Sequence, residues 1–175
     1  MVPDFALRIQ SMLRAMREVI MPAIAADQRL ALDQAAILVG NLRLMAEQCE
    51  NLYQYELVEL RESAVLVRAL LAAVEAQQDG VIAAAAEVLA RAAPIAELPI
   101  PPQASVALLT KELKIAADGL LQVCLKIGSP RARAAAGALV MAQSQTQIAR
   151  ERRWFKAAGF ELEPDKMPPL DEVLT

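Results

Sequence analysis

Residues 27–52 indicate the fold class, and they read DQRLALDQAAILVGNLRLMAEQCENL. On a helical wheel of about 100° per residue, the charged side chains that follow Asp27, the expected N-cap, share one side. They are Arg29, Asp33, Arg43, Glu47 and Glu50. The remaining arc, about 220° wide on that wheel, carries no charge. A charge-free arc beside a charged one predicts an amphipathic helix that buries its apolar side.

Three neutral amides lie inside this apolar arc, at a spacing of seven residues. They are Gln34, Asn41 and Gln48, and they alternate with Ile37, Leu38, Met45 and Leu52. Burying an amide without a partner costs about 1–3 kcal/mol, so a partner is expected for each. Two interpretations stay open: hydrogen bonds across helices that fix their register, or the polar wall of a ligand pocket.

Proline and glycine residues mark the ends of the predicted helices. We expect helices over residues 4–25 (bent near Pro22), 27–50, 55–78, 81–93, 103–128 and 129–157. Ser129 is expected to cap the last helix, with Pro130 at its first position. The Pro-rich stretch 94–102 shows no helix signal. Long helices with few long loops predict an all-α fold, an antiparallel (up-and-down) helix bundle of about five to six helices, four of them long.

The apolar stripes predict how individual helices pack. The stripe slips by about one residue between the second and third helices, so we expect a bend or break near residues 51–55. The third helix is apolar nearly all round, so it should lie centrally or against a second subunit. The first helix is expected to turn one set of side chains inward, namely Phe5, Ile9, Met12, Met16, Val19 and Ala23.

Length, charge and hydropathy bound the class of protein. At 175 residues, one helical domain over 1–158 is expected, followed by an irregular C-terminal tail over 159–175. A net charge of −3 argues against nucleic acid as a partner. No uninterrupted apolar run is long enough for a membrane span and no signal peptide is apparent, so a cytoplasmic location is expected. The hydrophobic content of 56% suggests a second buried surface, most simply a homodimer interface.

The composition also excludes several kinds of chemistry. The chain has no histidine, which removes catalytic triads and the usual His-containing metal sites. Its glycines are single and scattered, so no phosphate-binding loop is expected. We therefore predict no cofactor and no metal. Cys49 and Cys124 are expected to be separate buried thiols. We expect the carboxylates Glu56, Glu59 and Glu62 to form one solvated face, and the charged run 150–153 to be solvated as well.

Further polar side chains interrupt apolar faces elsewhere in the sequence. Arg61 and Arg68 flank the stripe of the third helix, and Glu112 lies within the apolar arc of 103–128. Gln145 and Arg152 lie close to the inward stripe of 129–157. If these side chains converge with the amides, they form a mixed-polarity cavity for a small, partly apolar, polar or anionic ligand. The full candidate set is Gln34, Asn41, Gln48, Arg61, Arg68, Glu112, Gln145 and Arg152.

Three functions remain open on this sequence. The first is a non-catalytic bundle that acts through association, as a homodimer or as an accessory subunit of another protein. The second is a binder of a small ligand, whose identity the sequence leaves unknown, in the mixed cavity. The third is a metal-free enzyme that uses Arg, Gln and Glu electrostatics. The stretch Leu7–Leu13 is superficially similar to the first helix of the arginine-rich chorismate mutases, but no matching set of Lys or Arg follows it.

Overall fold

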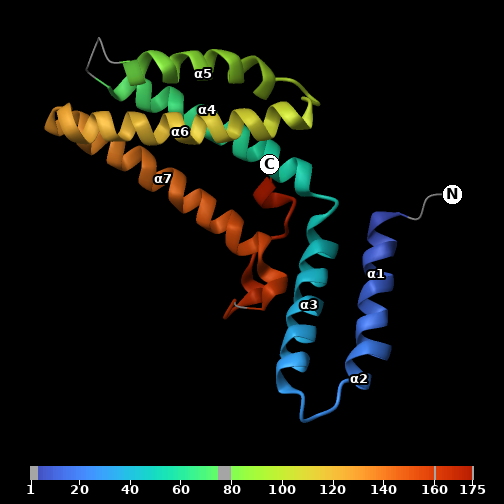
Figure 1. Cartoon of the computed structure of the whole chain (residues 1–175). Coiled ribbons are helices and arrows are strands. Elements are labelled where there is room, and N and C mark those ends of the chain that lie inside the picture. Colours follow the sequence, from blue (N-terminus) through green and yellow to red (C-terminus); the bar gives the residue numbers. More distant parts are fainter. Residues whose placement is uncertain (1–3, 75–79, 160, 175) are drawn as a thin grey trace. The chain divides into compact units, whose positions relative to one another are not determined.

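The computed structural model describes residues 4–74, 80–159 and 161–174, and these residues form helices and turns without a strand. Figure 1 labels the helices in chain order. They are α1 (Phe5–Ala15), a π-helical turn (Met16–Ile20), α2 (Met21–Ala23), α3 (Arg29–Gln48), α4 (Leu52–Ala73), α5 (Gly80–Ala96), α6 (Gln103–Ile127) and α7 (Pro130–Trp154). The all-α bundle is confirmed, while its antiparallel, up-and-down order stays a prediction.

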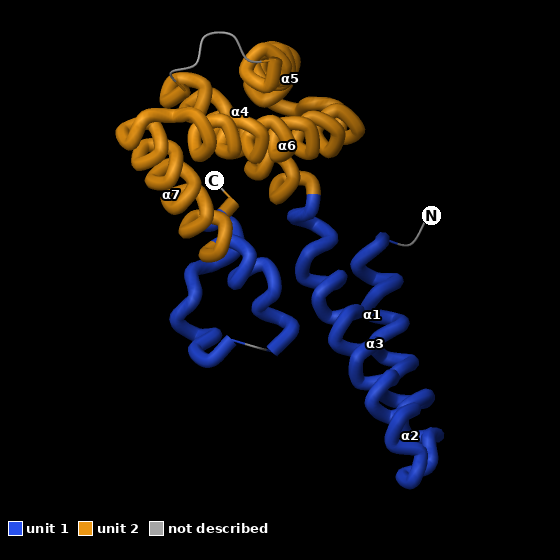
Figure 2. Tube along the Cα trace, turned by 60° about the vertical axis from the view of Figure 1, so that its left-hand side comes forward, with its two compact units in different colours: residues 1–52, 150–173 blue, residues 53–149, 174–175 orange. Residues whose placement is uncertain are grey.

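The chain forms two compact units, coloured separately in Figure 2. Unit 1 comprises residues 1–52 and 150–173, and unit 2 comprises residues 53–149 and 174–175. Each unit has its own cluster of buried side chains. The expected division into a bundle over 1–158 and a tail over 159–175 stays a prediction.

Unit 1 is built on a helical hairpin in which α1 lies beside α3 (Figure 1). The buried side chains of the hairpin are Ile9, Leu13 and Met16 on the first arm and Ala35, Val39 and Leu42 on α3. The prediction that Phe5, Met12, Val19 and Ala23 also face inward is wrong, because all four are exposed. The reason is that a helix packed against one other long helix buries only a narrow face.

Unit 2 buries α4 among α5, α6 and the greater part of α7. Leu60, Val67 and Leu70 of α4 have no exposed surface, and neither has Leu113 of α6. This nearly all-apolar helix therefore contributes much of the core of unit 2, although Val65 on another side of it is 59% exposed. The last expected residues of that helix, 75–78, lie outside the described residues.

Most of the predicted helix ends hold in the structure. The break between α3 and α4 falls at residues 49–51, slightly earlier than expected. The Ser129 hydroxyl accepts a hydrogen bond from the backbone N–H of Ala132 (3.2 Å), so the expected cap of α7 is present. The first helix is shorter than expected, because it ends at Ala23 and passes through a π-helical turn.

The expected end of α5 at residue 93 is wrong, because α5 runs to Ala96 with Pro94 inside it. Proline removes its own N–H donor, and its ring crowds the carbonyl four residues earlier, but it leaves the later N–H donors in place. The next donors continue the helical pattern, since the N–H of Glu97 bonds to the carbonyl of Ala93 (3.2 Å). Ala92, one turn earlier, is fully buried in the core of unit 2, and this packing holds the last turn in place.

The C-terminal residues of unit 1 fold back along the end of α7. Arg152 forms two hydrogen bonds to the Glu161 carboxylate (3.0 and 2.7 Å), and Arg153 donates to the carbonyl of Pro168 (3.0 Å). Short 3₁₀ turns form at Pro164–Lys166 and Glu172–Leu174, and Leu170 is buried. No helix of the described ranges combines the length and the apolar character that a membrane span requires.

Candidate functional site

The eight candidate residues of the sequence divide between the two units. Gln34, Asn41, Gln48 and Arg152 belong to unit 1, and Arg61, Arg68, Glu112 and Gln145 belong to unit 2. Several of them bind residues outside the candidate set, as the following paragraphs describe. Their convergence in a single cavity stays a prediction.

In unit 1, two of the three amides lie on a solvent-facing side of α3. Gln34 and Asn41 are exposed, although the wheel suggested that an apolar arc would be buried. Large aliphatic side chains surround them on the same helix and are exposed as well. We call this set the outer face of α3: Leu30, Gln34, Ile37, Leu38, Asn41 and Met45.

The outer face of α3 is left open because the hairpin uses a different side of the helix. Ala35, Val39 and Leu42 are buried in the hairpin core, and on the wheel they lie about 100–160° from Asn41. Leu30 keeps 75% of its surface exposed and Ile37 keeps 56%. The face contains no charged side chain. It is therefore an apolar surface with a central amide, which the described residues leave uncovered.

Gln48, the third amide, already has a partner within unit 1. Its side-chain N–H donates to the backbone carbonyl of Trp154 at the end of α7 (2.9 Å). Beside it, Arg153 Nη1 donates to Glu47 Oε1 (2.7 Å). These two contacts attach the end of α7 to the end of α3, and Trp154 is buried there.

In unit 2, the candidate cations and carboxylate stabilise helix–helix contacts. Arg61 Nε donates to the carbonyl of Ala96, the last residue of α5 (3.1 Å). Glu112 of α6 forms an ion pair with Arg91 of α5 (2.7 Å). Arg68 and Gln145 are exposed. The structure thus gives Arg61 the role of capping α5, and Glu112 that of joining α5 to α6.

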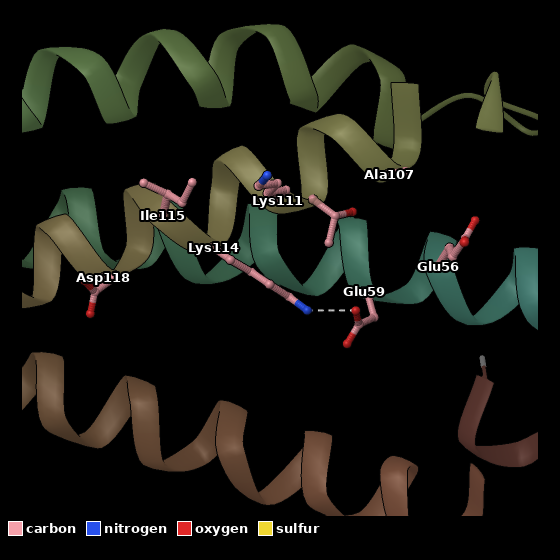
Figure 3. A pocket seen from close by; sticks show the side chains of 8 residues that line it. Glu56, Glu59, Ala107, Lys111, Lys114, Ile115 and Asp118 are labelled. Carbon is pink, nitrogen blue, oxygen red and sulfur yellow. Dashed lines mark hydrogen bonds and ion pairs between the residues drawn. The ribbon is translucent and has the colours of Figure 1, made fainter. Parts of the chain in front are cut away.

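A groove of about 550 Å³ runs between α4 and α6 in unit 2. Figure 3 shows Lys114 reaching from α6 to Glu59 of α4, and their charged atoms are 2.8 Å apart. Glu56 accepts a hydrogen bond from Gln103 (3.3 Å). The remaining lining residues are Ala107, Thr110, Lys111, Ile115 and Asp118. Both signs of charge line this groove, and they partly neutralise each other.

The prediction that Glu56, Glu59 and Glu62 form a solvated face is wrong, because all three are half-buried. Glu56 and Glu59 bind side chains of α6, and Glu62 accepts a hydrogen bond from Gln143 of α7 (2.9 Å). The spacing of three residues therefore serves to connect α4 to two neighbouring helices. Within the described ranges, no group of carboxylates and thiols has the geometry to hold a metal ion.

A second pocket of unit 2, of about 460 Å³, lies between α5 and α6. Its walls are aliphatic, with Val81, Val88 and Ile115 among them, and the ion pair of Arg91 and Glu112 lies at its edge. Gly119 forms part of the wall, and a Cβ placed there would lie 2.9 Å from a methyl group of Val81. Here a candidate residue, Glu112, lines a cavity of mixed polarity.

Sequence reasoning missed the most buried charge of unit 1. It singled out Arg152, whereas Arg150 is the arginine that is buried, with 2% of its surface exposed. The expectation of a solvated run over 150–153 is wrong for Arg150 and Arg153. Side chains two positions apart on a helix point in directions about 200° apart. Choosing Arg152 in place of Arg150 therefore selects a side chain on the opposite side of the helix.

Neither cysteine forms a disulfide, and Cys124 is buried in unit 2 as expected. Cys49 is half-buried, and its thiol donates to the carbonyl of Ala46 (3.5 Å). Comparison of the chain with known protein families, with curated proteins and with solved structures found no match.

Proposed function

We propose that this protein acts by association, as a homodimer or as an accessory subunit, and that it associates through the outer face of α3. The single observation that supports this function is the row of exposed aliphatic side chains on α3. Leu30, Ile37 and Met45 follow one another at steps of seven and eight residues, close to the repeat of helices that pack on helices. A contiguous apolar patch of this kind marks an interaction site more often than an ordinary surface.

The energetics favour covering this face. Burying a leucine or isoleucine side chain fully is worth about 1.5–3 kcal/mol, and the outer face offers several such side chains that are about half exposed. The exposed Phe5 and Met12 of α1 add further apolar surface to the same unit. Covering this surface gains hydrophobic free energy that offsets part of the entropy lost on association.

Native mass tests this function. We expect the purified chain to form an assembly larger than one chain in light scattering after size exclusion, and Leu38→Glu to shift it toward the monomer. Leu125→Glu on α6 is the matched control, because Leu38 and Leu125 are both 47% exposed. An equal effect of the two substitutions, or none from either, contradicts association through this face.

The pocket between α5 and α6 supports a second candidate, the binding of a small amphipathic ligand. The pocket joins an aliphatic wall to the Arg91–Glu112 ion pair, and its volume suits a small metabolite. Thermal-shift measurements with medium-chain carboxylates test it, because a ligand stabilises the folded state that binds it. Gly119→Val would fill the wall and abolish the shift, whereas an unchanged shift would rule out this pocket.

A further inference from the structure

Around Asn41, the residue types on this side of α3 are nearly symmetric along the sequence, when Leu44 and Gln48 at the edge of the outer face are included. Gln34 and Gln48 lie seven residues before and after it, and Ile37 and Met45 lie four residues before and after it. Leu38 and Leu44 lie three residues on either side. These three pairs match amide with amide and aliphatic with aliphatic, and Leu44 and Gln48 are the half-buried members of the set.

We infer that the partner on the outer face of α3 is α3 of a second copy, packed antiparallel about a two-fold axis at Asn41. This inference rests on the proposed function above. A sequence that is symmetric about one residue complements itself only when the second helix runs in the opposite direction. A two-fold axis requires this kind of surface, because each residue of one subunit meets its symmetric counterpart on the other.

The amides favour a second copy over a different apolar partner. An amide side chain carries both donors and acceptors, so Asn41 can bind its own copy across the axis. Gln48 already gives one N–H to the carbonyl of Trp154, and its oxygen can accept from Gln34 of the other copy. A purely apolar partner would leave Asn41 buried without a hydrogen bond, which is unfavourable.

Charge does not oppose this pairing. The charged residues of α3 lie outside the outer face, and Glu47 is already paired with Arg153 of its own chain. The surface that meets its copy is therefore uncharged. A single buried polar residue in an apolar helix interface fixes register and direction in coiled coils, and Asn41 takes that place here.

Cysteine cross-linking in the full-length chain tests the axis and the direction. The background variant is Cys49→Ala, which keeps the buried Cys124 as an internal negative control. Met45→Cys and Ile37→Cys are made singly in this background, and both keep Asn41. In an antiparallel pair centred on Asn41, residue 37 of one copy faces residue 45 of the other. Residue 37 then lies about 12 Å along the axis from its own copy, which is beyond disulfide reach.

We expect mild oxidation of a mixture of the two variants to produce a covalent dimer. Either variant oxidised alone should give no more than about a tenth of that yield. Asn41→Cys should cross-link to itself. Self-linking of Ile37→Cys as efficient as its linking to Met45→Cys overturns the antiparallel direction. A wild-type assembly that Leu38→Glu dissociates, without cross-linking at any of these sites, overturns the antiparallel pairing of α3 with its own copy about Asn41 and leaves the proposed function standing. A mass that Leu38→Glu does not change overturns both.

Discussion

Helices α3 and α4 follow one another in the chain and are similarly apolar, yet they have opposite surroundings. In unit 2, α4 buries most of its circumference, including Leu57, Val58 and Leu60. Among its described residues after Leu52, only the stripe of Arg61, Val65, Arg68 and Ala72 is exposed. In unit 1, α3 buries one narrow side against α1 and leaves Ile37 and Leu38 exposed. The comparison teaches that an apolar arc predicts which side of a helix can be buried. It does not predict whether other helices of the same chain pack against that side.

The difference also separates two kinds of stability. Unit 2 completes its core with its own helices, so its free energy of unfolding should not depend on protein concentration. Unit 1 leaves aliphatic surface exposed, so the proposed function predicts that the stability of unit 1 rises when a partner covers this surface. The predictions that follow test this contrast, beginning with the largest effect.

The largest effect is expected in the core of unit 2. Leu60→Ala removes a side chain with no exposed surface and leaves a cavity, so we expect it to lower the free energy of unfolding by about 3 kcal/mol. Urea unfolding at two protein concentrations measures this loss, which should be the same at both. Leu125→Ala, at a half-exposed position of α6, should cost much less. A loss below about 1 kcal/mol for Leu60→Ala would contradict the burial of Leu60 in the core of unit 2.

A smaller effect is expected where α7 is attached to α3 in unit 1. Arg153→Ala removes the ion pair with Glu47 and the hydrogen bond to Pro168, and the Arg153 side chain is only 12% exposed. We expect a loss of about 1–3 kcal/mol in urea unfolding, because Glu47 would keep its charge without this partner.

The control for this variant is Lys166→Ala. Its ion pair with Glu163 is formed by a side chain that is 75% exposed, so its loss should change stability by well under 1 kcal/mol. If both variants lose equal stability, the contact between Arg153 and Glu47 is not the attachment described here.

The smallest effect is expected from pH, through Arg152 and Glu161. The two hydrogen bonds from Arg152 hold the pKa of Glu161 below its ordinary value. The folded state therefore prefers the ionised carboxylate, so the pair stabilises unit 1 above the pKa of the unfolded chain. This stabilisation is lost as pH falls through the lower pKa of the folded state.

Glu161→Gln tests this pH dependence. The variant should melt slightly below the wild type at neutral pH, and the difference should close in acid as the carboxylate becomes protonated. Thermal melting over a pH series measures it. A difference that stays constant from neutral to acidic pH would contradict a role for the Glu161 charge.

Much of the fold could be predicted from the sequence because local signals determine it. The helix period and the Ser129–Pro130 pair placed α6 and α7 within a few residues of their observed ends. Pro94 misled the prediction of α5, because packing of Ala92 in the core of unit 2 outweighs one missing hydrogen bond. Local rules do not contain such tertiary contributions.

The candidate site was harder to predict, for two physical reasons. The wheel identified the amides Gln34 and Asn41 correctly as unusual, but exposure depends on neighbouring helices that a wheel does not contain. The direction of Arg150 and Arg152 was misjudged because alanines lie on many sides of α7, which leaves its apolar stripe poorly defined. The pairs Arg91–Glu112 and Glu59–Lys114 join different helices, so no spacing within one helix indicates them.

Hydrogen exchange of α3 at several protein concentrations tests the central claim, that the outer face of α3 is covered by a partner, most directly. We expect amides of α3 to exchange more slowly as the concentration rises through the assembly range, because opening then requires dissociation. Amides of α4 should exchange at a constant rate and serve as the internal control. Exchange in α3 that is the same at every concentration, in a chain that stays monomeric throughout, would contradict the account.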